Sequence, residues 1–229
     1  MAIEVTWLGH GCFSLATGKH RLIIDPFLDD NPAAPLKAKE VEADFILVSH
    51  GHFDHISDAA AIANRTGAIV LANYEVATWL HTQHKVQNTV GMNLGGATRQ
   101  AFGTAKFTLA QHSSQLPDGS YGGSPGGWLL TIEGKKLYFA CDTALFADMA
   151  TIGKTGLDLA VVPIGDLYTM GPEDSIAAIE LLQPRRVAPA HYNTWPPIAQ
   201  DAAAWAQQVK ARTKAEPIVV EPGGKFIIS

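Results

Sequence analysis

The sequence has little cysteine, no excess of basic residues and no long apolar run. Its two cysteines, Cys12 and Cys141, stand far apart in the 229 residues, which excludes a small secreted scaffold built on disulfides. Lysine and arginine number 17 against 22 aspartates and glutamates, the wrong balance for a dedicated nucleic-acid binder. No apolar segment approaches the ~18 residues that a membrane-spanning helix needs. The first ten residues carry an acid, Glu4, and no basic stretch, unlike a signal peptide, so we expect a cytoplasmic protein.

The composition is that of a folded chain with a sizeable core. Hydrophobic residues make up 47% and charged residues 17%, and a chain of this length buries roughly 70% of its unfolded surface. The loosest segment, 116–127, is rich in glycine and has strand-like segments on both sides, so it is interpreted as a long loop rather than a linker. We expect one domain over residues 1–229.

Periodicity and turn residues indicate an α/β fold with two groups of strands. Helices are expected at 59–63, where Ser57 or Asp58 provides a cap, and at 74–84, 172–182 and 198–212. The strand patterns occupy 3–7, 12–16, 21–24, 44–49, 68–72, 106–111, 128–132, 137–140, 157–163, 186–190, 217–220 and 225–228. Because strands are followed by helices twice along the chain, we expect two mixed β-sheets packed face to face with helices outside.

The most informative feature is a histidine cluster at the end of a buried strand. Three of the nine histidines fall within six residues, in the pattern His50-Gly-His52-Phe-Asp54-His55. On an extended or turning backbone His50 and His52 project to the same side, and Asp54 and His55 follow where the chain bends back. One metal ion can take the first pair and a second ion the other pair. Imidazole and carboxylate ligands suit zinc, and also iron or manganese.

Solvated or hydrogen-bonded histidines are the alternative interpretation of this cluster. That alternative fits a single isolated histidine well. It fits three histidines and an acid directly after a buried strand poorly, because buried polar groups must find partners.

The order of the chemically active residues resembles the metallo-β-lactamase superfamily, whose signature is this H-x-H-x-D-H motif. His112 in Ala-Gln-His-Ser-Ser, Asp142 in Tyr-Phe-Ala-Cys-Asp-Thr and His191 in Ala-Pro-Ala-His-Tyr each follow a strand, as the remaining landmarks of that superfamily do. The opening Trp-Leu-Gly-His-Gly-Cys-Phe and the later Leu-Ile-Ile-Asp-Pro-Phe are similar to small stand-alone hydrolases of the ascorbate-6-phosphate lactonase-like branch. The resemblance implies a four-layer αββα sandwich over nearly the whole chain.

The resemblance also implies a dinuclear metal site and a hydrolytic activity. By position, His50, His52 and His112 would bind one metal, Asp54, His55 and His191 a second, and Asp142 would bridge them. Two divalent ions, Zn²⁺ first and Mn²⁺ or Fe²⁺ as alternatives, would hold a hydroxide that attacks an ester, lactone or phosphodiester bond of a small molecule. Asp54 would also be the catalytic residue that orients this hydroxide.

Several other functions remain open within this resemblance. Diiron oxygen-reducing members usually carry glutamate where this chain has His52, and they carry a flavin domain for which there is no room. A nuclease that processes tRNA or other RNA would need a basic surface, which the charge balance disfavours. β-Lactamases are usually exported, and a non-catalytic metal-binding protein would have lost ligands. A small-molecule substrate is therefore the favoured partner, and a symmetric homo-oligomer is a further expectation because exposed apolar residues near the cleft loops could meet.

Three residues near the motif positions have open roles. His10 and Asp25 fit the branch pattern as cleft residues or as partners of a metal ligand, since metal-bound histidines donate their other N–H to a carboxylate or carbonyl. Asp25 fits equally well as a turn residue before Pro26. Cys141 stands where the superfamily commonly has glycine, and strand alternation predicts that it points away from the metals as a small buried apolar residue.

The dinuclear hypothesis makes a direct prediction for His52. We expect His52→Ala to abolish hydrolysis and to leave at most one metal ion per chain, because one of the three ligands of the first metal is lost. Emission spectrometry of the purified variant measures the metal content, and His84→Ala, expected on the surface, is the control. Full activity of the His52 variant would contradict the dinuclear model.

Overall fold

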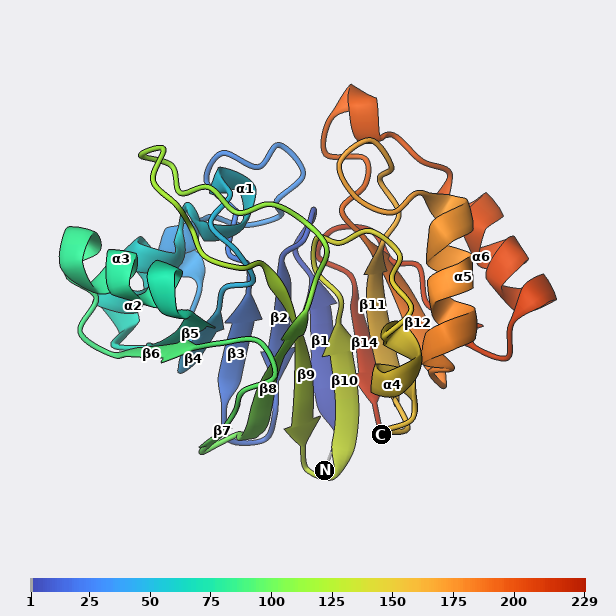
Figure 1. Ribbon diagram of the computed structural model, residues 1–229, viewed down its shortest axis with the longest axis horizontal. Helices are drawn as coiled ribbons and strands as arrows, with labels where there is room; N and C mark the ends of the chain where they lie inside the picture. Colours follow the sequence, from blue (N-terminus) through green and yellow to red (C-terminus); the bar gives the residue numbers. More distant parts are fainter. Residues whose placement is uncertain (1) are drawn as a thin grey trace.

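The computed structural model describes residues 2–229 and contains two seven-stranded sheets packed face to face with helices outside (Figure 1). The first sheet has the order β14-β1-β2-β3-β4-β5-β6 and the second β13-β12-β11-β10-β9-β8-β7. The expected four-layer αββα sandwich is therefore confirmed. The strands of the first sheet are β1 (Ile3–Trp7), β2 (Phe13–Ala16), β3 (Arg21–Ile24), β4 (Phe45–Leu47), β5 (Ile69–Asn73), β6 (Thr89–Met92) and β14 (Lys225–Ile228). Those of the second are β7 (Ala97–Gln100), β8 (Gly103–Leu109), β9 (Gly126–Ile132), β10 (Lys135–Phe139), β11 (Leu159–Pro163), β12 (Arg186–Ala190) and β13 (Glu216–Pro217).

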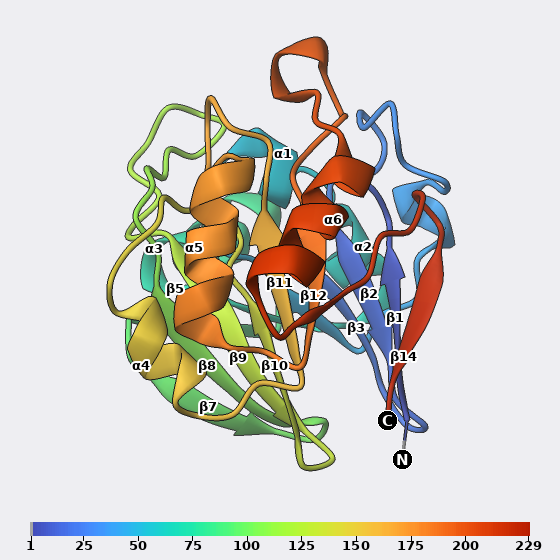
Figure 2. The same ribbon diagram turned by 90° about the vertical axis from the view of Figure 1, so that its right-hand side faces the viewer.

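The helices cover the two outer faces of the sandwich. On the side of the first sheet lie α2 and α3, and on the side of the second lie α4, α5 and α6 (Figures 1 and 2). No helix within residues 2–229 is long and apolar enough to cross a membrane. The helices are α1 (Phe53–Ile56), α2 (Ala59–Thr66), α3 (Tyr74–His84), α4 (Met149–Gly153), α5 (Pro172–Leu182) and α6 (Ala202–Arg212), with 3₁₀ turns at Ala38–Glu40 and Pro196–Ile198.

Strand direction brings distant parts of the chain to one end of the sandwich. In the first sheet β3, β4, β5 and β6 are parallel, and β1 shares their direction because it pairs antiparallel with β2, which pairs antiparallel with β3. In the second sheet β10, β11, β12 and β13 are parallel, and β8 shares their direction through β9. The segments that follow these strands emerge at the same end of their sheet.

The buried strands are continuous apolar runs in the sequence because both of their faces are covered. In β4, Phe45 and Leu47 join the core between the sheets, whereas Ile46 and the following Val48 face the helices α2 and α3. A strand covered on both faces needs apolar residues on both faces. Phe13 and Phe139 meet between the sheets with ring centroids 5.7 Å apart in an edge-to-face arrangement, a favourable aromatic geometry.

Most of the expected elements are present, with differences at sites where tertiary contacts override the local pattern. The last long helix begins at Ala202 rather than at 198, because Pro196–Ile198 forms a separate 3₁₀ turn and Asp201 caps the helix by accepting a hydrogen bond from the Ala204 amide. The strand expected at 217–220 is reduced to β13, and the one expected at 106–111 begins at Gly103. The sequence patterns did not indicate α1, α4, β6 or β7, which are short.

Asp58 precedes α2 as expected, but its side chain does not cap that helix. Instead its Oδ2 accepts hydrogen bonds from the amides of Leu28, at 2.6 Å, and Asp29, at 3.1 Å. The carboxylate therefore fixes the loop that follows β3, a contact between segments thirty residues apart that local sequence cannot reveal.

The packing between the sheets predicts a large cost for removing Phe13. Its side chain is 1% exposed, and Phe→Ala at such a site costs about 3–5 kcal/mol of unfolding free energy through lost burial and the cavity left behind. Urea unfolding of Phe13→Ala measures this cost. Tyr121→Ala, whose side chain is 71% exposed, should change stability by no more than about 0.5 kcal/mol, and equal effects of the two variants would contradict this account.

Candidate metal centre

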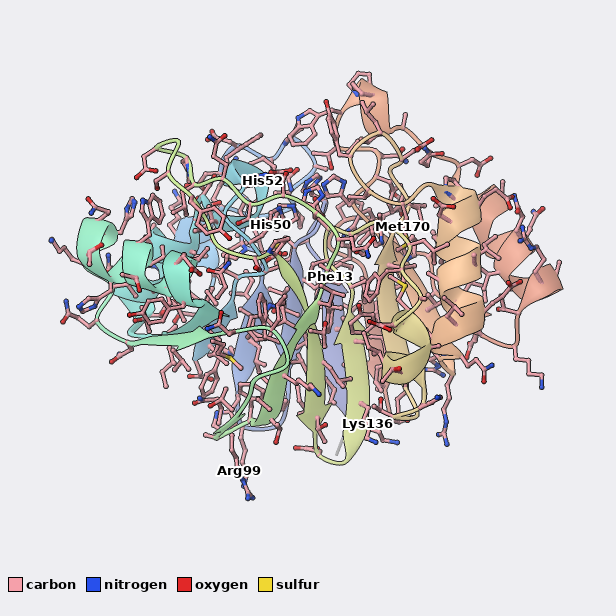
Figure 3. The ribbon with its side chains drawn as sticks, in the orientation of Figure 1. Phe13, His50, His52, Arg99, Lys136 and Met170 are labelled. Carbon is pink, nitrogen blue, oxygen red and sulfur yellow. The ribbon has the colours of Figure 1, made fainter. Side chains whose placement is uncertain are left out.

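All seven residues expected to bind metal follow strands that run in the same direction. His50 lies three residues beyond β4, and Asp54 and His55 lie in the adjoining α1. His112, Asp142 and His191 follow β8, β10 and β12. His50 and His52 lie at the end of the sandwich opposite the chain termini (Figures 1 and 3). The structure thus brings together residues from both sheets that are up to 141 positions apart, from 50 to 191.

His50, His52 and His112 form a compact group of three imidazoles. Each offers one ring nitrogen, and these atoms lie within 4.8 Å of one another. His50 Nε2 is 2.9 Å from His52 Nδ1. The ring of His112 is 5.1 Å from each of the other two rings. Three nitrogens converging on one point are the ligand arrangement that a single zinc-like cation requires.

The second group contains Asp54, His55 and His191, and also His10. Asp54 Oδ2 is 3.7 Å from the Nε2 atoms of both His55 and His191 and 2.9 Å from His10 Nε2. The sequence left the role of His10 open, and here it lies fully buried against the carboxylate of Asp54.

Asp142 lies between the two groups. Its Oδ2 is 3.6 Å from His112 Nε2 on one side, and 3.3 Å from His55 Nε2 and 3.0 Å from His191 Nε2 on the other. His50, His55 and Asp142 also place ligand atoms within 4.8 Å of one another. A carboxylate in this position can interact with cations on both sides.

Buried partners orient the imidazoles from behind. Asp25 Oδ2 accepts a hydrogen bond from His55 Nδ1 at 2.9 Å, which leaves Nε2 directed at the cluster. Asp25 also accepts hydrogen bonds from the backbone amide of Ser49 at 2.7 Å and from its hydroxyl at 2.6 Å, and Ser49 Oγ lies 2.9 Å from His50 Nδ1. One carboxylate therefore supports a histidine of each group. Of the roles expected for Asp25, the structure shows that of a hydrogen-bond partner of the candidate ligand His55. Asp25 is also the residue before Pro26.

Sequence analysis missed two further supporting side chains, Ser49 and Thr194. Thr194 Oγ1 lies 2.8 Å from His10 Nδ1 and fixes the ring whose other nitrogen meets Asp54. The position of Ser49 directly before His50 was the available signal for the first of them. No comparable signal marks Thr194, because its contact to His10 spans 184 residues.

The histidines of the cluster are of two kinds: in some the pKa is lowered, and in others it is raised. Burial, together with the nearby His191, lowers the pKa of His10 to about 4, although Asp54 acts in the opposite direction. Burial likewise lowers the pKa of His50 well below its usual value. For His191 burial acts in the same direction, but the carboxylates of Asp142 and Asp54 together outweigh it and raise the pKa to about 9.

His55 is buried among carboxylates, and Asp54 and Asp142 are buried among imidazoles. Burial lowers the pKa of His55, but Asp142, Asp54 and Asp25 together raise it well above its usual value. Burial raises the pKa of both Asp54 and Asp142, yet the neighbouring His55 and His191 hold them well below the usual range. Both carboxylates are therefore ionised and attract positive charge.

The cluster leaves ring nitrogens without hydrogen-bond partners, although they are buried. These atoms are Nε2 of His55 and both Nδ1 and Nε2 of His191. Buried polar atoms rarely lack partners, and here they lie beside two ionised carboxylates. A cation fits this donor set of imidazole nitrogens and carboxylate oxygens, which suits zinc, manganese or iron.

Four site residues have left-handed backbone conformations without being glycine. The φ values are +54° for His10, +47° for Asp25, +53° for Cys141 and +54° for His191. Such conformations cost on the order of 1–3 kcal/mol each and are kept where surrounding structure fixes them. At Gly11 an added Cβ would lie 2.9 Å from His55 Cε1, so only glycine leaves room for this ring.

For Cys141 one expectation fails, namely that alternation along a strand sets the direction of its side chain. The strand β10 ends at Phe139, so alternation along a strand does not set the direction of residue 141. Its side chain is only partly buried, and it lines a small hollow with Gly11, Asp142 and His191. Its thiol donates to the Phe139 carbonyl at 3.7 Å, and it belongs to none of the ligand groups found in residues 2–229.

The cluster opens into a cavity of about 480 Å³, a volume typical of small-molecule sites. Trp195 and Tyr168 line it, whereas the long glycine-rich loop 116–127 does not. Tyr192 is buried and stacks on Trp7 at 5.0 Å. The lining residues are His52, Phe53, Asp54, His112, Ser113, Asp142, Tyr168, His191 and Trp195.

Comparison with known proteins identifies the family. Residues 20–192 match the model of the β-lactamase superfamily domain. The chain belongs to the β-lactamase superfamily. Within it, the chain is 50% identical over 222 residues to a UPF0173 metal-dependent hydrolase of Thermus thermophilus, covering 96% of this chain and 97% of that protein. A UPF0173 metal-dependent hydrolase of Pelotomaculum thermopropionicum is 46% identical over 226 residues, covering 96% and 98%.

A solved structure agrees with this superfamily assignment. Igni18, described as a novel metallo hydrolase from Ignicoccus hospitalis, superposes with a TM-score of 0.89 at 34% identity, covering 100% of this chain and 99% of that one. Because these similar relatives over almost the whole chain are metal-dependent hydrolases, the chain is a metal-dependent hydrolase, which confirms the enzyme class expected from the sequence.

The hydrogen bonds of Asp25 predict a selective loss of metal affinity in Asp25→Asn. The amide cannot provide a negative charge behind His55, and loss of such a partner typically weakens metal binding about 10–100-fold. Competition with a chromophoric chelator measures the dissociation constant, and the exposed Asp30→Asn is the control. Unchanged affinity in Asp25→Asn would show that this carboxylate is not needed to orient His55.

Proposed function

We propose that the chain binds two divalent metal ions and hydrolyses an ester, lactone or phosphodiester bond of a small molecule. His50, His52 and His112 would hold one ion, and Asp54, His55 and His191 the other, with Asp142 shared. The observation that carries the proposal is the position of Asp142 Oδ2 between His112, at 3.6 Å, and His191, at 3.0 Å. Zn²⁺ is the proposed ion, with Mn²⁺ or Fe²⁺ as alternatives, because nitrogen and oxygen ligands accept all three.

When bound, two such ions lower the pKa of water toward about 7 and polarise the oxygen of the scissile bond. The protein residues have complementary tasks. Asp54 reaches the cavity and would accept a hydrogen bond from the attacking water, which orients it. His10, held by Thr194, fixes the carboxylate of Asp54 at 2.9 Å. We assign Asp54 the catalytic role and His10 a positioning role.

The proposed partner is a small molecule rather than a nucleic acid. A volume of about 480 Å³ suits one small substrate, and the 17 basic residues against 22 acidic ones provide no extended basic surface of the kind that binds phosphate backbones. We also retain the cytoplasm as the proposed compartment and a symmetric homo-oligomer as the proposed assembly. Both cysteines are free thiols, which suits a reducing compartment.

Metal reconstitution tests the proposal directly. We expect two ions per chain by emission spectrometry after loading with Zn²⁺, Mn²⁺ or Fe²⁺. We expect hydrolysis of at least one substrate in a panel of esters, lactones, phosphodiesters, thioesters and β-lactams, and its loss on chelation. One ion per chain would refute the dinuclear proposal, and inertness toward the whole panel with two ions bound would refute the proposed substrates.

Asp54→Asn tests the catalytic assignment. The amide keeps an oxygen ligand but is a poor proton acceptor, so we expect kcat to fall about 10²-fold or more. Steady-state kinetics on the best panel substrate, with metal content measured in parallel, separates this loss from loss of metal. Asp148→Asn, at an exposed carboxylate outside the cavity, is the control. An undiminished kcat in Asp54→Asn would remove Asp54 from the catalytic role.

A further inference from the structure

The cavity above the candidate metal centre has aromatic walls. Trp195 lies with Phe53 on one side, their ring centroids 6.1 Å apart, and both rings lie near Phe27, at 6.0 and 5.8 Å. Trp195 also meets His10 edge-on at 5.0 Å, so the aromatic group is anchored to the site. The side chains of Phe53 and Tyr168 are 54% and 56% exposed. These exposed fractions are large for aromatic residues that no other molecule covers.

The basic residues that line the cavity are histidines. Within residues 2–229 its lining includes neither lysine nor arginine. Six segments that follow strands at this end also have none of the 17 basic residues of the chain. These segments are 8–12, 49–57, 110–125, 140–148, 164–171 and 191–201, whereas the segment 25–44 after β3 contains Lys37 and Lys39.

Exposed carboxylates lie on these six segments and at the beginning of the segment after β3. Six aspartates beyond those of the metal centre and Asp25 are exposed there: Asp29, Asp30, Asp118, Asp148, Asp166 and Asp201. Asp166 stands two residues before Tyr168 of the lining. Like charges on the approach to a site lower the local concentration of an anionic ligand and its association rate. Beyond the proposed metal ions, the lining offers an anionic substrate neither lysine nor arginine.

We infer that the site takes an uncharged ester or lactone whose aromatic or other apolar group lies between Trp195 and Phe53 on one side and Tyr168 on the other. The inference rests on the proposed hydrolytic function and narrows it, because phosphodiesters are anions. Water adds its oxygen to the acyl carbon, and the bond from that carbon to the alkoxy oxygen breaks. One water proton leaves with the alcohol, and the other stays with the acid product, which ionises.

A matched pair of esters tests the charge preference of the metal-loaded enzyme. Four-nitrophenyl pentanoate and mono(4-nitrophenyl) adipate share a leaving group, and the second carries a remote carboxylate. We expect kcat/KM to favour the uncharged ester at least about tenfold. Leu167→Lys, beside Tyr168 and 65% exposed, should shrink this ratio about three- to tenfold by attracting the anion. Ile227→Lys, 44% exposed on β14, should leave the ratio unchanged. Equal or better use of the adipate ester would overturn the inference.

A binding measurement separates the failure of the inference from the failure of the proposed function. Nitroaromatic ligands quench tryptophan fluorescence, and 4-nitrobenzyl alcohol and 4-nitrobenzenesulfonate differ in charge. We expect the alcohol to quench the metal-loaded protein at about tenfold or more lower concentration than the sulfonate, and Trp195→Phe to lose this difference. If neither ester is hydrolysed, the hydrolytic proposal fails while the quenching still decides the charge preference. Equal quenching by both ligands, or preference for the sulfonate, would overturn the inference.

Discussion

The face-to-face packing of the two sheets is the constraint on which the metal centre depends. Neither sheet contains all the candidate ligands: His50 follows a strand of the first sheet, and His112, Asp142 and His191 follow strands of the second. Burial of apolar side chains between the sheets, including the contact of Phe13 with Phe139, therefore also fixes the distance between ligands. Since apolar burial contributes about 25 cal/mol per Å², the large inner core can hold a polar cluster that would not be stable alone.

The polar cluster is costly to form. Asp142 and several imidazoles are buried, Asp54 is partly buried, ring nitrogens of His55 and His191 lack partners, and four residues take left-handed backbone conformations. A bound cation would use the unpartnered nitrogens and balance the charge of Asp54 and Asp142, so metal binding and stability of the fold are linked. Strain at the ends of strands, as at His191, is the consequence of turning side chains toward a common point.

The aromatic walls of the cavity belong to a different part of the protein from the candidate metal ligands. The strands determine where the ligands stand, whereas the loops beyond them form the cavity walls through Phe53, Tyr168 and Trp195. Loops tolerate sequence change better than the strands they connect. Different loops on the same arrangement of strands can therefore suit different substrates, and in this chain the cavity walls are aromatic and lack lysine and arginine.

The sequence by itself determined the order of the longer elements and the residue types of the candidate site. Continuous apolar runs such as 44–49 indicated strands covered on both sides, and the H-x-H-x-D-H spacing after one of them indicated a metal site, because both signals are local. Only the tertiary structure decided that Asp25 supports His55, that Thr194 supports His10, that Asp58 fixes a loop instead of capping α2, and that Tyr168 faces the same cavity as Trp195. These contacts join segments far apart in the chain, and their partners are set by how the two sheets pack, which no local pattern encodes.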